Sequence, residues 1–443
     1  MVRKSNNKKS YYLITIGCQM NQADSERLAS FLEKKGFKLA ADFKKANLVI
    51  INTCGIKQAA EDRVYGLVNQ IRKDNYGAKI IISGCLSRRS DVQKRLVGRA
   101  DLFMPINEML QLPEIINGEK FNAKFSLDEV RLEKGEKYLD IEPKHESLYS
   151  AYVPIGNGCN NFCAYCVVPY ARGREVYRNS REIISEVKKL VKNGYREIIL
   201  IAQNVNSYKD EDLSFAELLA SLIKIPGKFW LRFSSSHPKD MSSELIKVIG
   251  SSDKVCHHLH LAVQSGDNDI LKRMNRRYTV EHYKNLIKKI RKSKPGIIIT
   301  TDIIVGFPGE TKKQFQNTVK LFKEINFDLA YISPYSPRPL TASAKMKDSV
   351  KPAEKKRRVQ FLNEILKSSS LGNHQKYLGK IVEVLVGGIN KRGKYYGKMS
   401  GYQTVLINAK AKTKNNLNKK IIGQFVKVKI NEALPFGLEG DLV

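Results

Sequence analysis

Short runs of β-branched and other apolar residues alternate with amphipathic segments along most of the chain, which constrains the fold to the α/β class. Parallel strands need long crossover connections, and amphipathic helices supply them. Three of these runs lie at 11–16, 48–51 and 79–82, and six more at 151–155, 197–201, 230–234, 258–263, 297–304 and 329–333. We predict a parallel α/β domain at 10–125 and, at 145–372, a partial (βα)6 barrel with fewer strands than a closed eight-stranded one.

A cysteine follows each of the three runs in the first domain within three residues, namely Cys18, Cys54 and Cys85. The loops that leave the carboxyl ends of parallel strands converge on one crevice, so we expect these thiols to meet in space. The alternative is that they are small apolar residues packed at strand ends. Because the same placement occurs three times, we favour a shared ligand set.

Three further cysteines, Cys159, Cys163 and Cys166, form a C-x3-C-x2-C loop directly after the run at 151–155. Three thiolates within eight residues suit a 4Fe-4S cluster better than zinc, whose structural sites take four protein ligands. The fourth iron is then open to the amino and carboxylate groups of S-adenosylmethionine (SAM). The alternative is a structural metal site with a distant fourth ligand. The seventh cysteine, Cys256, has no such placement and is expected to be a packed or surface thiol.

The last part of the chain, 376–443, consists of short alternating segments punctuated by glycines, which is typical of a small antiparallel β-barrel. A Lys-rich helical stretch at 353–370 precedes it, and a charged stretch at 125–150 reads as a linker between the first two domains. Residues 376–443 hold 13 Lys plus Arg against 4 Asp plus Glu. Tyr395, Tyr396 and Tyr402 lie among these cations, so bases could stack on the rings while the cations bind phosphates. The alternative is a solvated basic domain with surface tyrosines.

The whole chain carries 77 Lys plus Arg against 44 Asp plus Glu, a formal net charge of +33. This excess favours a polyanionic partner such as nucleic acid, although a general lysine bias of the genome gives the same total. No stretch approaches the roughly 18 apolar residues of a membrane helix, and the first ten residues lack the apolar core of a signal peptide. We therefore expect a cytoplasmic protein without a membrane partner.

Five segments resemble the methylthiotransferases of the radical SAM superfamily, most closely the MiaB branch: CNNFCAYCVVPYARGREVYR from Cys159, LIAQNVNSY at 200–208, SSSHP at 234–238, HLHLAVQSGDNDILKRMNR at 258–276 and DIIVGFPGET at 302–311. The resemblance covers almost the entire chain. It implies a three-part layout: a methylthiotransferase domain, a radical SAM domain and a C-terminal RNA-binding TRAM domain.

The resemblance also implies two 4Fe-4S clusters and SAM as cofactors. Cys18, Cys54 and Cys85 match the ligands of an auxiliary cluster that carries the sulfur to be inserted. Cys159, Cys163 and Cys166 match the catalytic cluster, at which SAM gives the radical that abstracts hydrogen from an unactivated carbon. A further SAM methylates the sulfur.

Several polar residues at predicted strand ends are candidate SAM contacts: Tyr165, Gln203, Asn204, Arg232 and Gln264. Arg232 and Asp302 could equally form buried structural pairs. Among the neighbouring histidines, His258 and His260 should point to one face of their strand and His257 to the other. We interpret these three as structural or substrate-side residues rather than metal ligands.

The stretch VVPYARGREVYR is most similar to the MiaB branch. That branch adds sulfur and a methyl group at C2 of N6-isopentenyladenosine beside the tRNA anticodon. Its activity requires an electron donor such as flavodoxin or ferredoxin and a sulfur source. Two neighbouring branches act on N6-threonylcarbamoyladenosine in tRNA and on an aspartate of a ribosomal protein. A different class of function, an RNA-binding iron-sulfur redox sensor without catalysis, is the remaining alternative.

Overall fold

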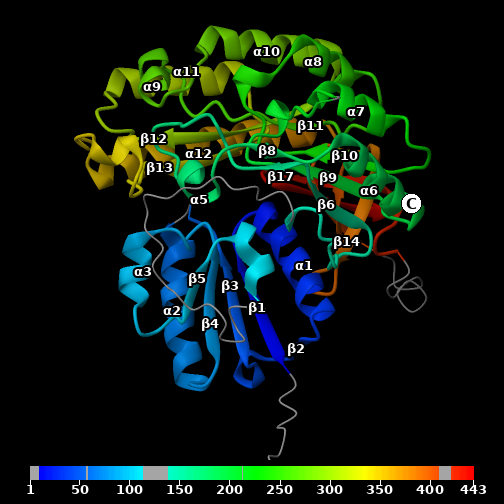
Figure 1. Ribbon diagram of the computed structural model, residues 1–443. Coiled ribbons are helices and arrows are strands. Elements are labelled where there is room, and N and C mark those ends of the chain that lie inside the picture. Colours follow the sequence, from blue (N-terminus) through cyan, green and yellow to red (C-terminus); the bar gives the residue numbers. More distant parts are fainter. Residues whose placement is uncertain (1–8, 56–57, 113–137, 212, 409–420) are drawn as a thin grey trace, which may run out of the picture.

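A computed structural model describes residues 9–55, 58–112, 138–211, 213–408 and 421–443. Three folded parts follow one another along the chain (Figure 1). The N-terminal part, in blue, lies below a larger central part in green and yellow, and the C-terminal strands, in orange and red, lie behind the central part. None of the helices in these residues combines the length and apolar character that a membrane span requires.

The N-terminal part is a five-stranded parallel sheet in the order β2-β1-β3-β4-β5. Its elements are β1 (Ser10–Ile16), α1 (Gln19–Lys34), β2 (Lys38–Leu39), β3 (Leu48–Thr53), α2 (Gln58–Asp74), β4 (Lys79–Gly84), α3 (Ser90–Leu96) and β5 (Leu102–Met104), with 3-10 turns η1 (Phe43–Lys45) and η2 (Ile106–Gln111). The three predicted strands are confirmed as β1, β3 and β4.

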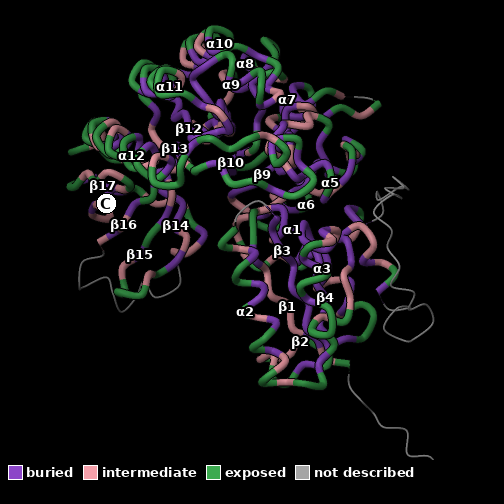
Figure 2. The backbone as a smooth tube through the Cα atoms, turned by 90° about the vertical axis from the view of Figure 1, so that its left-hand side faces the viewer, coloured by how far each residue is buried: buried purple, intermediate pink, exposed green. Residues whose placement is uncertain are grey.

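All six residues of β3 are buried because helices cover both faces of the sheet. One core joins the sheet to α2 and α3, and the other joins it to α1, η2 and residues 138–139. The inner faces of the helices are correspondingly buried and their outer faces exposed (Figure 2). Of the predicted linker at 125–150, the part at 125–137 lies outside the described residues, whereas Tyr138 and Leu139 belong to the N-terminal core.

The central part contains two three-stranded parallel sheets, β6-β9-β10 and β11-β12-β13. Isolated parallel bridges join them, for example between Ser236 and Leu261, so that the six strands follow one another as in a partial barrel. The strands are β6 (Ser150–Pro154), β9 (Glu197–Ile201), β10 (Trp230–Phe233), β11 (His258–His260), β12 (Ile298–Val305) and β13 (Leu329–Pro334). The prediction of six strands is confirmed, although β11 is shorter than expected.

The helices of the central part are α5 (Val168–Arg172), α6 (Ser180–Lys192), α7 (Phe215–Ile223), α8 (Ser243–Gly250), α9 (Asn268–Arg273), α10 (Val280–Ser293), α11 (Lys312–Ile325) and α12 (Pro352–Gln375). A short ribbon of β7 (Gly156–Asn157) and β8 (Val176–Tyr177) and the turns η4 (Val205–Ser207), η5 (Pro238–Asp240) and η6 (Ala342–Lys345) complete it. Both sheets and most of these helices share one continuous core, so the six βα units fold as one body.

The C-terminal part is a closed five-stranded barrel of β14 (Ile381–Ile389), β15 (Tyr395–Met399), β16 (Thr404–Asn408), β17 (Phe425–Leu434) and β18 (Gly437–Leu442). The predicted antiparallel pairing holds for four of the strand pairs. The fifth pair, β16 with β18, is parallel and closes the barrel. The expectation of a wholly antiparallel barrel is therefore wrong at this closure.

Two interfaces hold the parts together. Met20 and Ala23 of α1 pack against Ile199 and Ile201 of β9, which seats the N-terminal part on the first sheet of the partial barrel. At the second interface, Trp230 and Cys256 of the central part pack against Leu385 of the C-terminal barrel. The first of these interfaces determines how the two groups of cysteines face each other.

Candidate functional site

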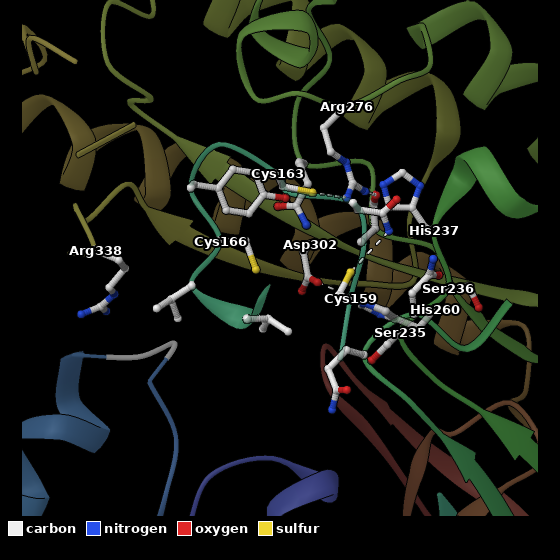
Figure 3. Close-up of a pocket in the computed structure, with 18 residues that line it drawn as sticks. Cys159, Cys163, Cys166, Ser235, Ser236, His237, His260, Arg276, Asp302 and Arg338 are labelled. Atoms are coloured by element: carbon white, nitrogen blue, oxygen red, sulfur yellow. Dashed lines mark hydrogen bonds and ion pairs between the residues drawn. The ribbon is translucent and has the colours of Figure 1, made fainter. Parts of the chain in front are cut away.

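Cys159, Cys163 and Cys166 lie in the loop between β7 and α5 and line one cavity of about 260 Å³ (Figure 3). Backbone hydrogen bonds shape the loop: Cys159 N–H donates to the carbonyl of Gly173 over 3.1 Å, and Cys166 N–H to that of Cys163 over 2.9 Å. The three sulfurs are thus presented to one space by a compact loop, as the sequence predicts.

Two of the three thiols in the cavity have raised pKa values. Burial, followed by the neighbouring Cys163, raises the pKa of Cys166 to about 12. Burial also raises the pKa of Cys159 to about 11. Since a coordinating metal deprotonates a thiol outright, a cationic group in this cavity would supply the compensation that thiolates need there.

Four of the five expected SAM contacts line the same cavity: Tyr165, Gln203, Asn204 and Gln264. Gln203 has a structural task as well, because its Oε1 accepts the N–H of Gly158 over 2.5 Å. Asn204 donates from Nδ2 to Asp240 over 2.7 Å. Among the described residues, three buried oxygens of the cavity lining have no hydrogen-bond partner: Asn204 Oδ1, Ser236 Oγ and Gln264 Oε1. A polar ligand would satisfy all three.

Arg232, the fifth, lies outside the cavity lining. Its Nε binds Glu197 Oε1 at 2.5 Å, and its terminal nitrogens donate to the carbonyls of Met399 and Ser400 at 2.8 and 2.7 Å. Of the two interpretations of Arg232, the buried structural pair is the one that matches this position. Cys256, 1% exposed, is a packed thiol beside it.

Two histidines are placed as the alternation predicts. His258 and His260 both contact Thr300 Oγ1, at 2.9 and 3.0 Å, so they share one face of β11. His260 also pairs with Asp302 over 3.1 Å, and both line the cavity. His257 lies elsewhere, 3.6 Å from Asp253.

The most consequential residue that the sequence reasoning missed is Arg276. It lines the cavity and donates from Nη1 to the Sγ of Cys163 over 3.5 Å and from Nε to Tyr278 Oη over 2.7 Å. It follows helix α9 rather than a strand, so the search of strand ends does not reach it. His237 was missed too, although it lies within the quoted SSSHP segment and its place after β10 is a strand-end signal.

Cys18, Cys54 and Cys85 follow β1, β3 and β4, which are neighbours in one sheet. A Cβ built on Gly17 would lie 2.9 Å from the Cβ of Cys54, and one built on Gly55 would lie 3.3 Å from the Cβ of Cys85. Cys54 therefore lies beside the backbone that flanks Cys18, and Cys85 lies beside the backbone that flanks Cys54. The expectation that the three strand ends converge is confirmed.

The two cysteine groups face the same boundary between the N-terminal and central parts. Arg338, which lines the cavity of Cys159, Cys163 and Cys166, reaches into the N-terminal part, where its Nη1 donates to Gln58 Oε1 over 2.7 Å. In Figure 3 the N-terminal part, in blue, lies directly below this cavity. One side chain thus spans the distance between the cavity and α2.

Three family descriptions match successive parts of the chain. They are "Uncharacterized protein family UPF0004" at residues 10–103, the radical SAM superfamily at residues 153–322 and the TRAM domain at residues 375–443. Each match falls on one of the three folded parts described above.

Curated relatives match over the full length. The tRNA-2-methylthio-N(6)-dimethylallyladenosine synthase of Carboxydothermus hydrogenoformans is 42% identical over 98% of this chain and 100% of its own. The synthase of the same name from Clostridium tetani is 41% identical over 99% of this chain and 97% of its own. Among solved structures, the radical SAM methyltransferase TsrM from Kitasatospora setae, with cobalamin and a [4Fe-4S] cluster, superposes with a TM-score of 0.56 at 15% identity, over 76% of this chain and 77% of its own. This last likeness concerns the fold alone.

The radical SAM match implies SAM and 4Fe-4S clusters, and the residues fit both. Within the described ranges, no three His, Cys, Asp or Glu side chains are gathered around a single metal ion. A cubane cluster instead takes its thiolates on different iron atoms, which suits two separate groups of three cysteines. The unpartnered oxygens of the cavity suit the polar groups of SAM. The chain belongs to the radical SAM methylthiotransferases, in the family of the tRNA-2-methylthio-N(6)-dimethylallyladenosine synthases.

Proposed function

We propose that the protein adds a methylthio group to C2 of N6-isopentenyladenosine, the dimethylallyladenosine of its relatives' names, beside the anticodon of tRNA. One observation carries this proposal: identity of 42% to such a synthase extends over 98% of this chain and the whole of the relative. A relative that shared only the central barrel would leave the substrate open. Here the match includes both cysteine groups and the barrel at the C-terminus.

We assign Cys159, Cys163 and Cys166 to the catalytic 4Fe-4S cluster. When bound there, the cluster supplies the electron for reductive cleavage of SAM. The polar groups of SAM would find buried oxygens on Asn204, Ser236 and Gln264.

We assign Cys18, Cys54 and Cys85 to a second 4Fe-4S cluster, which carries the sulfur to be inserted. The support is geometric, because the strand ends that bear these cysteines face the boundary onto which the catalytic cavity also opens. An adenosine held at this boundary lies within reach of both groups. The proposed domains are then 10–125, 145–372 and 376–443.

The C-terminal barrel is the proposed RNA-binding domain, and its rings have different tasks. Tyr395 is 5% exposed and belongs to the barrel core, whereas Tyr396 is 37% exposed. Tyr402 stacks on His258 at 4.9 Å between centroids, and Lys398 Nζ lies 3.4 Å from its ring centroid. Of the three tyrosines proposed from sequence to stack on bases, Tyr396 therefore presents the most accessible ring.

The turn between β14 and β15 adds exposed Lys391 and Arg392, which lie a few residues before Tyr396 in the chain. Neutralisation of phosphates by such cations supplies most of the sequence-independent affinity for RNA. The proposal further requires two partners, a low-potential electron donor such as flavodoxin or ferredoxin and a source of sulfur.

The test is mass spectrometry of nucleosides from the tRNA of a host that lacks its own methylthiotransferase, with and without expression of this protein. We expect 2-methylthio-N6-isopentenyladenosine to appear with the protein and not with Cys163→Ala. Methylthio-threonylcarbamoyladenosine in its place would move the substrate to the neighbouring branch. Neither nucleoside from a protein loaded with iron and sulfide would overturn the proposal in favour of a ribosomal-protein substrate or a noncatalytic role.

A further inference from the structure

Arg172 is the last residue of α5, the short helix that follows Cys166, and it belongs to the central part of the molecule. In Figure 1, α5 lies directly above the N-terminal part. The side chain of Arg172 is 2% exposed and crosses the boundary to the cysteines of the N-terminal part. We propose that Arg172 is a positioning residue that raises the reduction potential of the cluster at Cys18, Cys54 and Cys85; this rests on the proposed function.

All three guanidinium nitrogens of Arg172 have partners. Nε donates to the Sγ of Cys85 over 3.4 Å, Nη2 to Asp24 Oδ2 over 2.8 Å and Nη1 to Asn157 Oδ1 over 3.0 Å. Asn157 donates back from Nδ2 to the carbonyl of Arg172 over 3.4 Å. The direction of the Nε–H bond toward sulfur is therefore held from both sides of the domain boundary.

The buried charges around this contact do not balance. Asp24 pairs with Arg172 and is also attracted by Arg27. Glu186 lies 3.7 Å from Arg27 and binds Arg178 at 2.6 Å. Three guanidinium groups thus accompany two carboxylates. One of the three, that of Arg172, contacts Cys85. A buried excess of positive charge is costly unless an anion lies beside it. A cluster on thiolates is such an anion.

Unpartnered polar atoms mark the same place. Among the described residues, neither Asp24 Oδ1 nor Tyr138 Oη has a hydrogen-bond partner, and both residues are buried. Cys85, which is 3% exposed, therefore has a buried and polar environment, where one hydrogen bond has a large electrostatic effect.

Reduction adds negative charge to a cluster. A hydrogen bond to a ligand sulfur and a nearby fixed cation both stabilise the reduced form, so they shift the potential to less negative values. Loss of Arg172 should make the second cluster harder to reduce. Because Arg172 is anchored six residues after Cys166, the domain that cleaves SAM controls the electronics of the cluster in the other domain.

The experiment uses the full chain with Cys159, Cys163 and Cys166 replaced by Ala, so that a single cluster remains. After anaerobic reconstitution, iron per chain is counted and the reduction potential is measured by a dye-mediated titration followed by electron paramagnetic resonance. We expect Arg172→Met to load iron and to shift the potential to more negative values. Arg172→Lys, which keeps the charge, should shift it less. The matched control is Arg276→Met, a buried arginine that contacts the other cysteine group, and it should leave the potential unchanged.

The outcomes separate the inference from the proposed function. If the parent triple variant binds no iron, the second cluster itself is refuted, and the inference with it. If Arg172→Met loads iron at an unchanged potential, only the inference is overturned. If Arg172→Met does not load, Asp24→Asn decides, because it leaves the charge of Arg172 uncompensated. A less negative potential in Asp24→Asn supports the inference, and an unchanged one overturns it.

Discussion

Arg276 donates a hydrogen bond to the sulfur of Cys163 from a position that is 6% exposed. The same guanidinium donates to Tyr278 Oη and to the carbonyl of Ala262, so its orientation is determined by three partners. A buried cation therefore lies beside the middle cysteine of the loop, where it would face the negative charge of a bound cluster. Tyr278 in turn donates to the carbonyl of Val263, which ties this arrangement to the segment that follows β11.

Arg276→Met should therefore impair both stability and SAM cleavage. We expect the free energy of unfolding to fall by about 2 kcal/mol, since buried acceptors lose their donor, and reductive cleavage of SAM to fall at least roughly tenfold, the effect of about 1.4 kcal/mol on the barrier. Urea denaturation and release of 5′-deoxyadenosine measure the two effects. The matched control is Arg277→Met at the adjacent exposed arginine, and equal losses in both variants would contradict the role of Arg276.

The two cysteine groups should fail in different ways. Cys163→Ala removes one of three thiolates from the catalytic loop and should abolish SAM cleavage and methylthiolation alike. Cys54→Ala leaves that loop intact and should abolish methylthiolation while it retains SAM cleavage within about twofold. Cleavage is retained because its barrier is set in the cavity of Cys159, Cys163 and Cys166. Both activities are measured on the same reconstituted samples. Equal loss of cleavage in the two variants would refute two separate clusters.

The residues that the sequence reveals are those whose positions depend on one strand at a time. Cys18, Cys54 and Cys85 each follow their own strand, and the geometry of a parallel sheet brings strand ends together without further information. The same reasoning misses Arg172, Arg276 and Arg338 because they lie in or after helices or in irregular segments. The partners of Arg172 and Arg338 depend on how the N-terminal part docks on the central one. Arg276 instead contacts Cys163, which lies far from it along the central part. Neither kind of contact leaves a periodic signal in the sequence.

The misplaced expectations have the same physical origin. Arg232 lies at a strand, as a cofactor contact should, but its side chain meets the carbonyls of Met399 and Ser400, which arrive from a separate domain. The parallel pair of β16 and β18 likewise closes a barrel whose hairpins alone suggest antiparallel pairing throughout. Local pattern predicts elements well, whereas closure and docking depend on contacts far apart along the chain.

Arg232→Met should destabilise the protein by about 3 kcal/mol or more, because it leaves the carboxylate of Glu197 buried without its cation. Two carbonyls of the C-terminal barrel also lose their donors. The matched control is Lys228→Met, since Lys228 pairs with Glu383 across the same domain boundary with its side chain 63% exposed. A surface pair should contribute less than about 1 kcal/mol. Urea denaturation measures both, and equal effects would contradict the anchoring role of Arg232.

The stability of the protein should fall in mild acid through His237. Burial, followed by the charge of Arg276, lowers the pKa of His237 to about 2 in the folded protein. The unfolded chain takes up this proton near pH 6.5, so the free energy of unfolding decreases as pH falls from about 6.5 toward about 2. At about pH 5 the loss is about 2 kcal/mol, at about 1.36 kcal/mol per pH unit. Urea denaturation at about pH 7.5 and about pH 5 should show a loss about 2 kcal/mol smaller in His237→Gln than in the wild type. A loss remains in the variant because burial also lowers the pKa of His258. Equal losses in the two proteins would refute the assignment.

Gly158 should be indispensable for the catalytic loop. Its φ is +83°, and a Cβ there would lie 2.0 Å from the carbonyl oxygen of Arg174, so Gly158→Ala must displace the backbone that carries Cys159. In a protein with Cys18, Cys54 and Cys85 replaced by Ala, we expect bound iron to fall from about four per chain to near zero. Gly194 is the matched control, with φ of +91° and no atom within 4 Å of the added Cβ. Gly194→Ala should cost about 1 kcal/mol of backbone strain and retain its iron, because strain alone does not move the cysteines. Equal iron loss in both variants would show that the clash at Gly158 does not cause the loss of iron.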